Sequence, residues 1–391
     1  MFSLLWVFFP LGLALEQMHL EMLAASTPSG LQYDDEAIAV KAKGWVRHNT
    51  FAHLPWLNCF EKDTGSNESR YDVAVLGAPH DLSVTVRPGA RYGPQNIRSV
   101  SNGMSFGYSV YNDRDPLRDW AKIVDCGDAP MSWVDKLVAL DTLDQAHRLI
   151  SQKPAANPQK SRVPRIMMLG GDHSTTLSAL RSVHHHWGKV SVIHFDSHID
   201  TWDTQGSVSE YAQVSSLLIS IPPANPTCSK LDHGTFLYIA HQQGLLTDTS
   251  IHAGLRARHF FRQDVTTDQQ CGFSTVTARD IDKLGIQGVI GRIRERVGDG
   301  VVYVTVDIDV LDPAFAPATG TPEPGGWSTR ELLSILNGLE GLKVVGADIV
   351  EVAPVYDTIS QTTVLAATEI GMGLLDLLVA APVEQMHPVS H

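Results

Sequence analysis

The sequence has little cysteine, no excess of basic residues and few long apolar runs. Its 4 cysteines among 391 residues form no CxxC pair, which argues against a zinc ribbon and against a dense disulfide scaffold. Its 30 basic residues are outnumbered by 43 acidic ones, giving a net charge of −13, whereas a phosphate-binding face needs a local excess of Lys and Arg. We therefore expect no nucleic-acid partner. The acidity favours small cationic partners, although it can also serve solubility alone.

The N-terminus carries the apolar run that bears on targeting. Residues 2–15 are almost entirely apolar, about as long as the core of a signal peptide and too short to span a bilayer. Small residues precede a cleavage point after Ala14, and Asn67 begins a glycosylation sequon. We expect a signal peptide over 1–15 and a protein of the secretory pathway. The alternative is an uncleaved, buried N-terminal segment of a cytoplasmic protein. No other stretch is expected to cross a membrane, so the mature form should have no membrane contact.

The rest of the chain has the composition of a globular protein, with 43% hydrophobic and 19% charged residues. Its length fits two or three domains or one large α/β unit. Residues 16–70 are irregular and polar and predict an N-terminal arm. From Tyr71 short apolar runs alternate with helical stretches, which predicts a single domain over 71–391.

The alternation predicts an α/β fold: a mostly parallel central sheet between two layers of helices, in an αβα arrangement. The predicted strands are Asp72–Ala78, Ile123–Asp125, Arg165–Leu169, Val190–Phe195, Ser250–Leu255, Val301–Asp307 and Lys343–Glu351. The predicted helices are Leu140–Ser151, Ser174–His186, Ile286–Val297, Thr329–Leu339 and Thr363–Val379, with a capping box from Ser328 to Glu331. In such sheets ligands bind beyond the carboxyl ends of the strands.

Acidic and imidazole side chains gather at three predicted strand ends. Gly170-Gly171-Asp172-His173 follows one strand, Asp196-Ser197-His198-Ile199-Asp200 a second, and Asp307-Ile308-Asp309 a third. The i, i+2, i+4 spacing would place Asp196, His198 and Asp200 on one side of an extended segment, and Asp307 and Asp309 would repeat that geometry. So many carboxylates repel one another unless cations compensate them.

Two divalent metals would balance the charges of these four aspartates, with His173 and His198 as neutral nitrogen ligands. Mixed carboxylate and imidazole ligands without sulfur fit Mn²⁺ better than Mg²⁺, which prefers oxygen ligands only. A single aspartate at a strand end usually caps a loop, but three such motifs in one chain indicate a reactive site.

At these motifs the sequence resembles the ureohydrolases, the family of arginase, agmatinase and their relatives. The resemblance rests on the three metal motifs, extends through 312–313 and 318–326, and covers Val73 to Leu378. It implies an arginase-like fold and a binuclear Mn²⁺ centre. It further implies that one ion is held by His173, Asp196, Asp200 and Asp307, and the other by Asp196, His198, Asp307 and Asp309, with Asp196 and Asp307 bridging.

The resemblance also implies hydrolysis of a guanidino substrate to urea and an amine. A guanidinium carbon is a poor electrophile, so a metal pair is needed to activate water near neutral pH. The departing amine needs a proton donor, and His233 looks like the family's proton-shuttling histidine. Glu351 looks like the carboxylate that grips the guanidinium in a fork-to-carboxylate match. We count Asp200 with His233 and Glu351 as catalytic candidates. Taken alone, His233 and Glu351 would be ordinary surface residues.

Agmatine, which would give putrescine and urea, is the first candidate substrate. The segments 87–94 and 232–236 look more like the agmatinase branch than arginase. 4-Guanidinobutyrate, giving 4-aminobutyrate and urea, is the second candidate, and arginine is a weaker one. Rival hypotheses are a non-catalytic metal-binding homologue and a metal-dependent deacylase, although a carboxylate such as Glu351 suits a cation better than a neutral amide. The resemblance implies a homo-oligomer, a trimer or a hexamer.

The stretch 214–229 departs from the family, because the connection between Asp203 and His233 is longer than usual there. A long loop inside a compact domain is either functional or a sign of error. It is interpreted as a substrate-gating loop or as a retained intron, and sequencing the transcript distinguishes the two.

Three other features are expected to lie outside the chemistry. His184-His185-His186 is expected to be solvated surface at a helix end. The Pro and Gly residues of 87–94 predict a tight turn entering a helix, at the pocket rim or a subunit contact. His194 shares the face of Asp196 but has no ligand role in the family pattern, so it is expected to pack or to lie behind the ligands.

Overall fold

The structure, a computed structural model, describes residues 49–61, 69–161, 163–203 and 230–383. These described residues form one compact unit. The expected signal peptide over 1–15, the sequon at Asn67 and the unusual stretch 214–229 lie outside the described residues.

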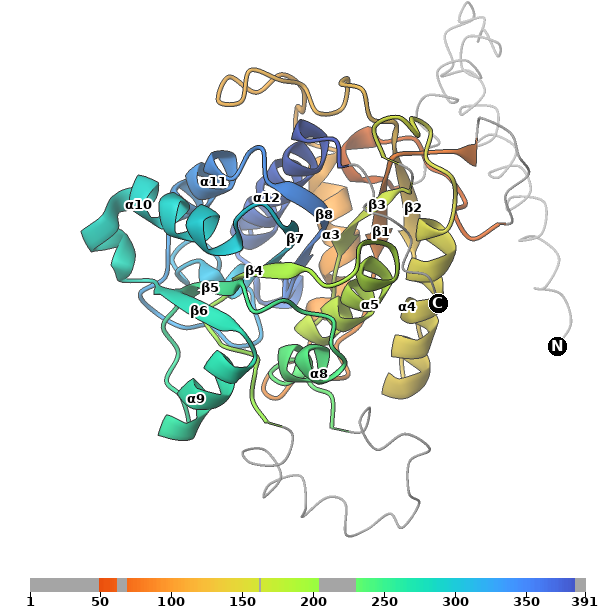
Figure 1. The fold of residues 1–391 in the computed structure, drawn as a ribbon. Coiled ribbons are helices and arrows are strands. Elements are labelled where there is room, and N and C mark those ends of the chain that lie inside the picture. Colours follow the sequence, from red (N-terminus) through yellow and green to blue (C-terminus); the bar gives the residue numbers. More distant parts are fainter. Residues whose placement is uncertain (1–48, 62–68, 162, 204–229, 384–391) are drawn as a thin grey trace, which may run out of the picture. The chain divides into compact units, whose positions relative to one another are not determined.

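The centre of the fold is an eight-stranded sheet in which every pairing of neighbouring strands is parallel (Figure 1). Its spatial order is β2-β1-β3-β8-β7-β4-β5-β6. The strands are β1 (Val73–Gly77), β2 (Ile123–Asp128), β3 (Arg165–Leu169), β4 (Ser191–Phe195), β5 (Ser250–Leu255), β6 (Phe273–Thr277), β7 (Val301–Asp307) and β8 (Lys343–Val350). The predicted parallel sheet is confirmed. Strand β6 was not predicted, because it is a short edge strand in which polar residues remain partly exposed.

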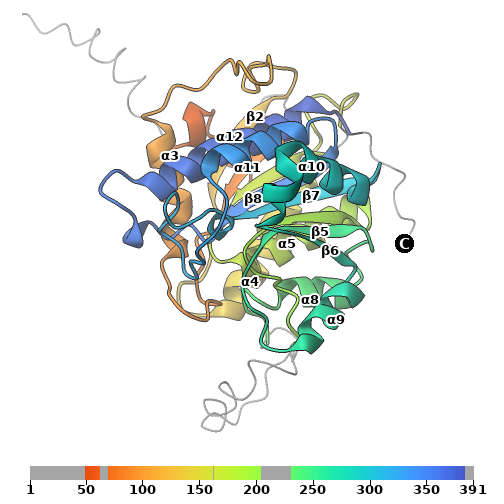
Figure 2. The same ribbon diagram turned by 90° about the vertical axis from the view of Figure 1, so that its left-hand side faces the viewer.

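Helices cover both faces of the sheet, as Figures 1 and 2 show. One layer consists of α3 (Gly93–Ser101), α10 (Asp280–Val297), α11 (Thr329–Gly338) and α12 (Thr362–Ala380). The other consists of α4 (Lys136–Ser151), α5 (Thr176–Trp187) and α8 (Phe236–Gln242), while α9 (Arg262–Gln270) lies beside β6. Alternate strand residues enter two separate cores: Met167 packs with the first layer and Met168 with the second. The αβα prediction is confirmed.

Local capping chemistry sets several helix starts. The predicted capping box of α11 is present, since Ser328 Oγ accepts from the Glu331 N–H and Glu331 accepts from the Ser328 N–H. Helix α4 begins four residues before the predicted Leu140, because the Asp135 side chain accepts from two N–H groups of its first turn. Helices α8 and α9 were not predicted from the sequence.

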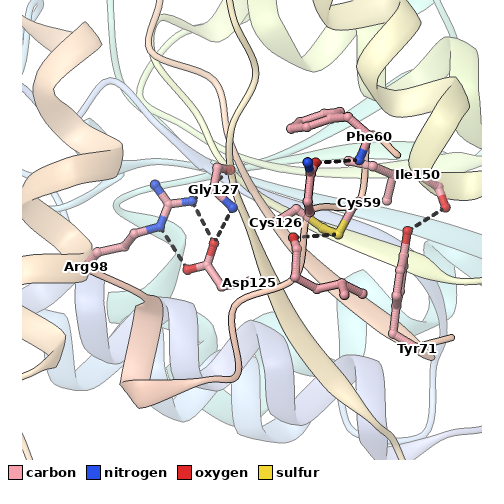
Figure 3. Close-up of a disulfide and its surroundings, with 10 residues drawn as sticks. Cys59, Phe60, Tyr71, Arg98, Asp125, Cys126, Gly127 and Ile150 are labelled. Carbon is pink, nitrogen blue, oxygen red and sulfur yellow. Dashed lines mark hydrogen bonds and ion pairs between the residues drawn. A yellow bond between two sulfur atoms is a disulfide. The ribbon is translucent and has the colours of Figure 1, made fainter. Parts of the chain in front are cut away.

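The described part of the expected N-terminal arm is not separate from the domain. Phe51 is fully buried, and its N–H donates to the carboxylate of Asp125 on β2. Cys59 forms a disulfide with Cys126 of the same strand, beside the contact of Arg98 with Asp125 (Figure 3). The arm prediction is therefore wrong over 49–61, because its few apolar residues and one cysteine dock on β2.

Helix α12 is long and apolar enough to cross a membrane, a property that was not expected of any stretch after the leader. Most of its apolar window is buried inside the fold, where it packs against β8, α3 and α11. Its composition is that of a helix at the centre of a layer.

Removing the disulfide should destabilise the domain. Cys59 and Cys126 are 67 positions apart, so the bond closes a long loop and restricts the unfolded chain. Replacing both with Ser should lower the free energy of unfolding by about 4 kcal/mol, measured by denaturant unfolding. Reductant should bring the parent protein to the same value and leave the double variant unchanged. Equal stability of variant and oxidised parent would contradict the prediction.

Candidate active site

The candidate residues converge because they follow neighbouring strands. Strands β3, β8, β7 and β4 are consecutive in the sheet, and their parallel direction brings their carboxyl ends to one edge. His173 follows β3, Glu351 follows β8, Asp307 ends β7, and Asp196 follows β4. The three motifs of the sequence thus meet at the centre of one sheet edge.

The first ligand group surrounds His173. Its Nδ1 lies 3.1 Å from Asp196 Oδ2, 3.2 Å from Asp200 Oδ2 and 3.4 Å from Asp307 Oδ2. These are the four residues expected to hold one metal ion. All of them are buried.

The second ligand group surrounds His198. Its Nδ1 lies 3.3 Å from Asp196 Oδ1 and 3.0 Å from Asp309 Oδ2. Asp196 thus directs one oxygen toward each group, as a bridging carboxylate would. Asp307 contacts the first group through Oδ2, while its Oδ1 accepts from the Asp309 N–H at 2.8 Å.

The expected extended geometry of these motifs is wrong. Strand β4 stops at Phe195, and the chain then turns, so that Asp200 has a φ of 50°. Asp309 lies in a 3₁₀ turn over Ile308–Val310, directly after β7. The carboxylates converge because turns fold them back over the sheet edge, a geometry that residue spacing alone cannot specify.

The electrostatics of the first group favour a bound cation. His173 Nδ1 and Asp196 Oδ2 are buried without a hydrogen-bond partner, although they are close to each other. Burial, followed by the charges of Asp309 and Asp196, raises the pKa of Asp307 well above its usual value. Burial and the Asp196 charge also raise the pKa of Asp200 to about 6. Divalent metal ions fit this donor set, because they replace protons as the compensating charge.

Buried hydrogen bonds orient His173. Its Nε2 lies 2.8 Å from Thr305 Oγ1, and Thr305 is in turn hydrogen-bonded to the buried Asp348. A proton on Nε2 leaves Nδ1 free to bind a metal, which is how ligating histidines are usually fixed.

His233 and Glu351 form a pair beside the ligand groups. His233 Nδ1 lies 2.9 Å from Glu351 Oε1. Burial alone would lower the pKa of His233, but the charge of Glu351 and this hydrogen bond outweigh burial and raise it to about 9. On the other side of the ring, Nε2 lies 3.1 Å from the Thr85 nitrogen and 2.7 Å from its Oγ1. When His233 Nε2 carries no proton, it accepts a hydrogen bond from the Thr85 N–H. When His233 Nε2 is protonated, it can donate to the Thr85 hydroxyl. The ring therefore has a hydrogen-bond partner in both protonation states.

Glu351 leaves only one oxygen for a ligand. Oε1 already accepts from His233 and from the His173 N–H at 2.9 Å, whereas Oε2 is buried without a partner. A two-point grip of a guanidinium, as the resemblance implied, is therefore not available in this arrangement. Oε2 can accept one N–H.

A cavity of about 1110 Å³ opens over the ligand groups. Among the expected residues, His198, Asp200, Asp307 and His233 line it. Sequence reasoning missed other lining residues on loops: Thr85, Trp202, Arg258, Phe260 and Glu323. Loop positions carry no periodicity, so no pattern in the sequence identifies them.

The expected turn before α3 lies at the cavity rim. Arg87 lines the cavity, and its guanidinium donates to the carbonyls of Thr319 and Gly320 on the opposite side. The chain then makes a short 3₁₀ turn over Ala90–Tyr92 and enters α3, as expected. Arg87 therefore ties two rim loops together.

One histidine expectation needs correction. Of the 184–186 run, His185 is exposed, but His186 is partly buried and contacts Ser151 Oγ at 3.0 Å. His194 lies behind the ligand candidate Asp196, as expected, with its Nε2 3.1 Å from Asp196 Oδ2. Burial, above all, lowers the pKa of His194 to about 3.

The fold and site define a metal-dependent α/β enzyme with room for two ions at the carboxyl edge of a parallel sheet. Residues 71–375 match the model of the arginase family. A Schizosaccharomyces pombe protein with the provisional name agmatinase 1 is 45% identical over 345 residues, covering 85% of this chain and 83% of its own. The agmatinase of Neisseria meningitidis serogroup C is 36% identical over 79% of this chain and 88% of its own.

Solved structures agree with the sequence comparisons. The proclavaminate amidinohydrolase of Streptomyces clavuligerus has a TM-score of 0.69 and 34% identity, covering 86% of this chain and 99% of its own. The chain belongs to the arginase family. The family and the arginase-like fold expected from the sequence are confirmed.

Metal binding should release protons. Burial alone would lower the pKa values of His173 and His198, but the facing carboxylates outweigh burial and raise both well above the usual value. Both rings are therefore protonated at neutral pH in the metal-free protein, and ligation must displace those protons. Affinity should rise with pH until both rings titrate. Calorimetry in buffers of different ionisation enthalpy measures the released protons. Binding heats independent of the buffer would contradict the prediction.

Proposed function

We propose that the protein hydrolyses agmatine to putrescine and urea with two Mn²⁺ ions. The observation that carries the proposal is the meeting of two carboxylate–imidazole groups with the His233–Glu351 pair. It is a hydrolase of amidine C–N bonds, as its relatives indicate. His173, Asp196, Asp200 and Asp307 would hold one ion, and His198 and Asp309 would join Asp196 and Asp307 around the other. Nitrogen ligands favour Mn²⁺ over Mg²⁺, and metal analysis of the purified protein tests this choice.

When bound, the ions lower the pKa of water enough to supply a nucleophile near neutral pH. Water adds to the guanidinium carbon, and the bond from that carbon to the alkyl nitrogen breaks, giving urea and an amine. Glu351 Oε2 accepts a substrate N–H and orients the guanidinium. His233 holds a proton at Nε2, with Thr85 beside it, and delivers it to the departing amine. Trp202 and Phe260, with ring centroids 5.3 Å apart, line the cavity and can pack on the methylene chain.

The lining of the cavity carries charges of both signs in addition to the ligand candidates. Asp232 suits the ammonium of agmatine, whereas Glu323 lies beside the second ligand group, with its Oε1 4.0 Å from His198 Nε2. Arg258 is exposed there and forms no hydrogen bond or ion pair with the described residues, which favours 4-guanidinobutyrate as the second candidate. The carboxylate of that substrate would give Arg258 a partner.

Urea release by Mn²⁺-loaded protein from agmatine, 4-guanidinobutyrate and arginine in parallel tests the proposal. Selective turnover of agmatine supports it, and selective turnover of 4-guanidinobutyrate supports the alternative. No urea from any of them, with two ions bound, would reject amidine hydrolysis and favour a non-catalytic metal-binding homologue.

Reversing the charge of Arg258 should shift the preference toward agmatine. Arg258→Glu removes the attraction for a carboxylate and adds one for an ammonium. The ratio of kcat/KM for 4-guanidinobutyrate to that for agmatine should fall about tenfold, since each exposed charge pair contributes modestly. Arg262→Glu, an exposed charge reversal on α9 whose residue does not line the cavity, is the matched control. A ratio that changes equally in both variants would exclude a local effect.

Replacing His233 with Asn should slow turnover and alter its pH dependence. Loss of a proton donor costs roughly 10²–10⁴-fold in rate. The donor must be protonated, so activity should fall as pH rises through its pKa, which Glu351 raises to about 9 and bound cations lower again. The variant should lack this alkaline limb and retain both metals. His241→Asn, on α8, is the control. An unchanged limb in the His233 variant would assign the proton donor elsewhere.

Passage through the secretory pathway is a further proposal. It is supported by the apolar leader, by the sequon at Asn67 and by the Cys59–Cys126 disulfide, since disulfides persist in oxidising compartments. Expression in a eukaryotic cell tests it: glycosidase-sensitive protein in the medium would support it, and an intact leader on cytosolic protein would reject it. A homo-oligomer, trimer or hexamer, is proposed from the family resemblance, and light scattering measures the mass.

A further inference from the structure

The proposed proton donor has a protein group at each ring nitrogen. His233 Nδ1 lies 2.9 Å from Glu351 Oε1, and His233 Nε2 lies 2.7 Å from Thr85 Oγ1. His233 is only 8% exposed, whereas Thr85 is exposed and lines the cavity. A proton that leaves Nε2 along its existing hydrogen bond therefore arrives at the Thr85 hydroxyl.

The main chain beside Thr85 holds the same histidine. The His233 N–H donates to the Ser83 carbonyl at 3.1 Å, and the Ser83 N–H donates to Asp172 Oδ2 at 2.9 Å. The Asp172 N–H donates in turn to the His80 carbonyl at 2.7 Å. Ser83 and Thr85 thus contact both the backbone and the ring of His233, which fixes the position of the ring relative to the hydroxyl.

The other end of the loop that carries Thr85 is fixed as well. The buried Asp81 carboxylate accepts from the Gly89 N–H at 2.7 Å, which closes the loop. Arg87 Nε donates to the Gly320 carbonyl at 3.1 Å, across the cavity rim. A hydroxyl on a loop that is held at both ends has a defined position, and proton transfer depends on such alignment of donor and acceptor.

The two groups of Thr85 that face Nε2 differ in what they can do. An ionised carboxylate only accepts, so His233 Nδ1 carries a proton toward Glu351. The Thr85 N–H, 3.1 Å from Nε2, can only donate, and it pairs with Nε2 once that nitrogen has lost its proton. The Thr85 hydroxyl is both donor and acceptor, so it can receive the Nε2 proton while it releases its own. Thr85 therefore serves the ring before and after proton transfer.

We propose that the Thr85 hydroxyl relays the proton from His233 to the departing amine, as a catalytic residue of the proposed hydrolysis, on which this inference rests. When the bond from the guanidinium carbon to the alkyl nitrogen breaks, its electron pair stays on that nitrogen and takes the hydroxyl proton of Thr85. The Nε2 proton moves to Thr85 Oγ1 in the same step. Thr85 ends as a hydroxyl and His233 as a neutral ring held by the Thr85 N–H, until a proton from solvent restores its charge.

The competing arrangement has His233 deliver its proton directly, while Thr85 only positions the ring. Nε2 would then have to leave Thr85 and turn toward the substrate. Both arrangements predict slower turnover when the hydroxyl is lost, so the rate alone does not separate them. They differ in the number of protons that move while the C–N bond breaks, which is two in a relay and one in direct delivery.

The solvent isotope effect on urea release counts these protons. Single-turnover rates of the Mn²⁺-loaded parent with agmatine, in mixtures of H₂O and D₂O, should follow a curve against the deuterium fraction, as two moving protons require. Thr85→Val keeps the shape of the side chain and the backbone N–H but removes the hydroxyl, and its rates should follow a straight line. Its kcat should be about 10²-fold lower with KM little changed, because a proton donor acts in the transition state.

Matched variants separate the hydroxyl from the loop. Thr85→Ser restores a hydroxyl and should recover most of the rate and the curvature. Val84→Thr makes the reverse isosteric exchange at the preceding residue, which is half-buried and does not line the cavity, and should behave as the parent does. Thr85→Ala serves if the Val variant does not fold, and thermal unfolding and metal content are measured for each variant.

A substrate with a weakly basic leaving nitrogen gives the second readout. Replacing the methylene next to the guanidino group of agmatine by oxygen makes the leaving group an alkoxyamine, whose nitrogen needs less help from a proton donor. The difference in rate between the parent and Thr85→Val should shrink about tenfold on this analogue. A merely structural role of Thr85 would leave that difference unchanged.

A straight line in the parent would overturn the relay. Parent-like rate and curvature in folded Thr85→Val would overturn it as well. Both results require turnover by the parent, so they differ from failure of the proposed hydrolysis, in which the parent releases no urea and the relay falls together with the reaction.

Discussion

The concentration of buried carboxylates at one edge of the sheet is the constraint on which the rest of the site depends. Asp196, Asp200, Asp307 and Asp309 lie within a few side chains of one another, away from water. Such a cluster is stable only when cations or protons compensate it. The histidines around the cluster meet that requirement in part, because the facing carboxylates raise the pKa values of His173 and His198 and keep their rings protonated in the metal-free protein. Bound metal ions would displace these protons and take over the compensation.

Backbone strain at the same edge has a comparable origin. Asp200 and Glu351 both adopt positive φ angles, of 50° and 61°, which are costly for residues with a Cβ. Each is held there by a main-chain hydrogen bond: the Leu237 N–H donates to the Asp200 carbonyl, and the Glu351 N–H donates to the Gly171 carbonyl. The chain thus turns sharply enough to bring carboxylates from different strands to one point, and the surrounding fold bears the cost.

The sequence predicts the elements better than it predicts how their ends turn. The alternation of apolar runs was sufficient for the parallel sheet, and the acidic and imidazole motifs were sufficient to select residues that meet in space. The extended geometry assigned to Asp196 and Asp200 was wrong, because a turn after β4 depends on contacts with α8 and not on local spacing. The contacts of His194 with His252, and of His252 with Asp268, could not be inferred, because these residues come from other elements.

The two ends of the cavity are under different constraints. At the metal end, every side chain is held by strands, turns and buried hydrogen bonds, so few substitutions preserve the geometry. Elsewhere in the lining, Arg258 and Phe260 lie on the loop after β5, and neither is one of the ligand candidates; we call this part of the cavity its far end. Loops tolerate change because their residues carry little of the core. The chemistry at a guanidinium carbon can therefore stay fixed while the charge at the far end changes, which makes that end the part of this structure that selects among guanidino compounds.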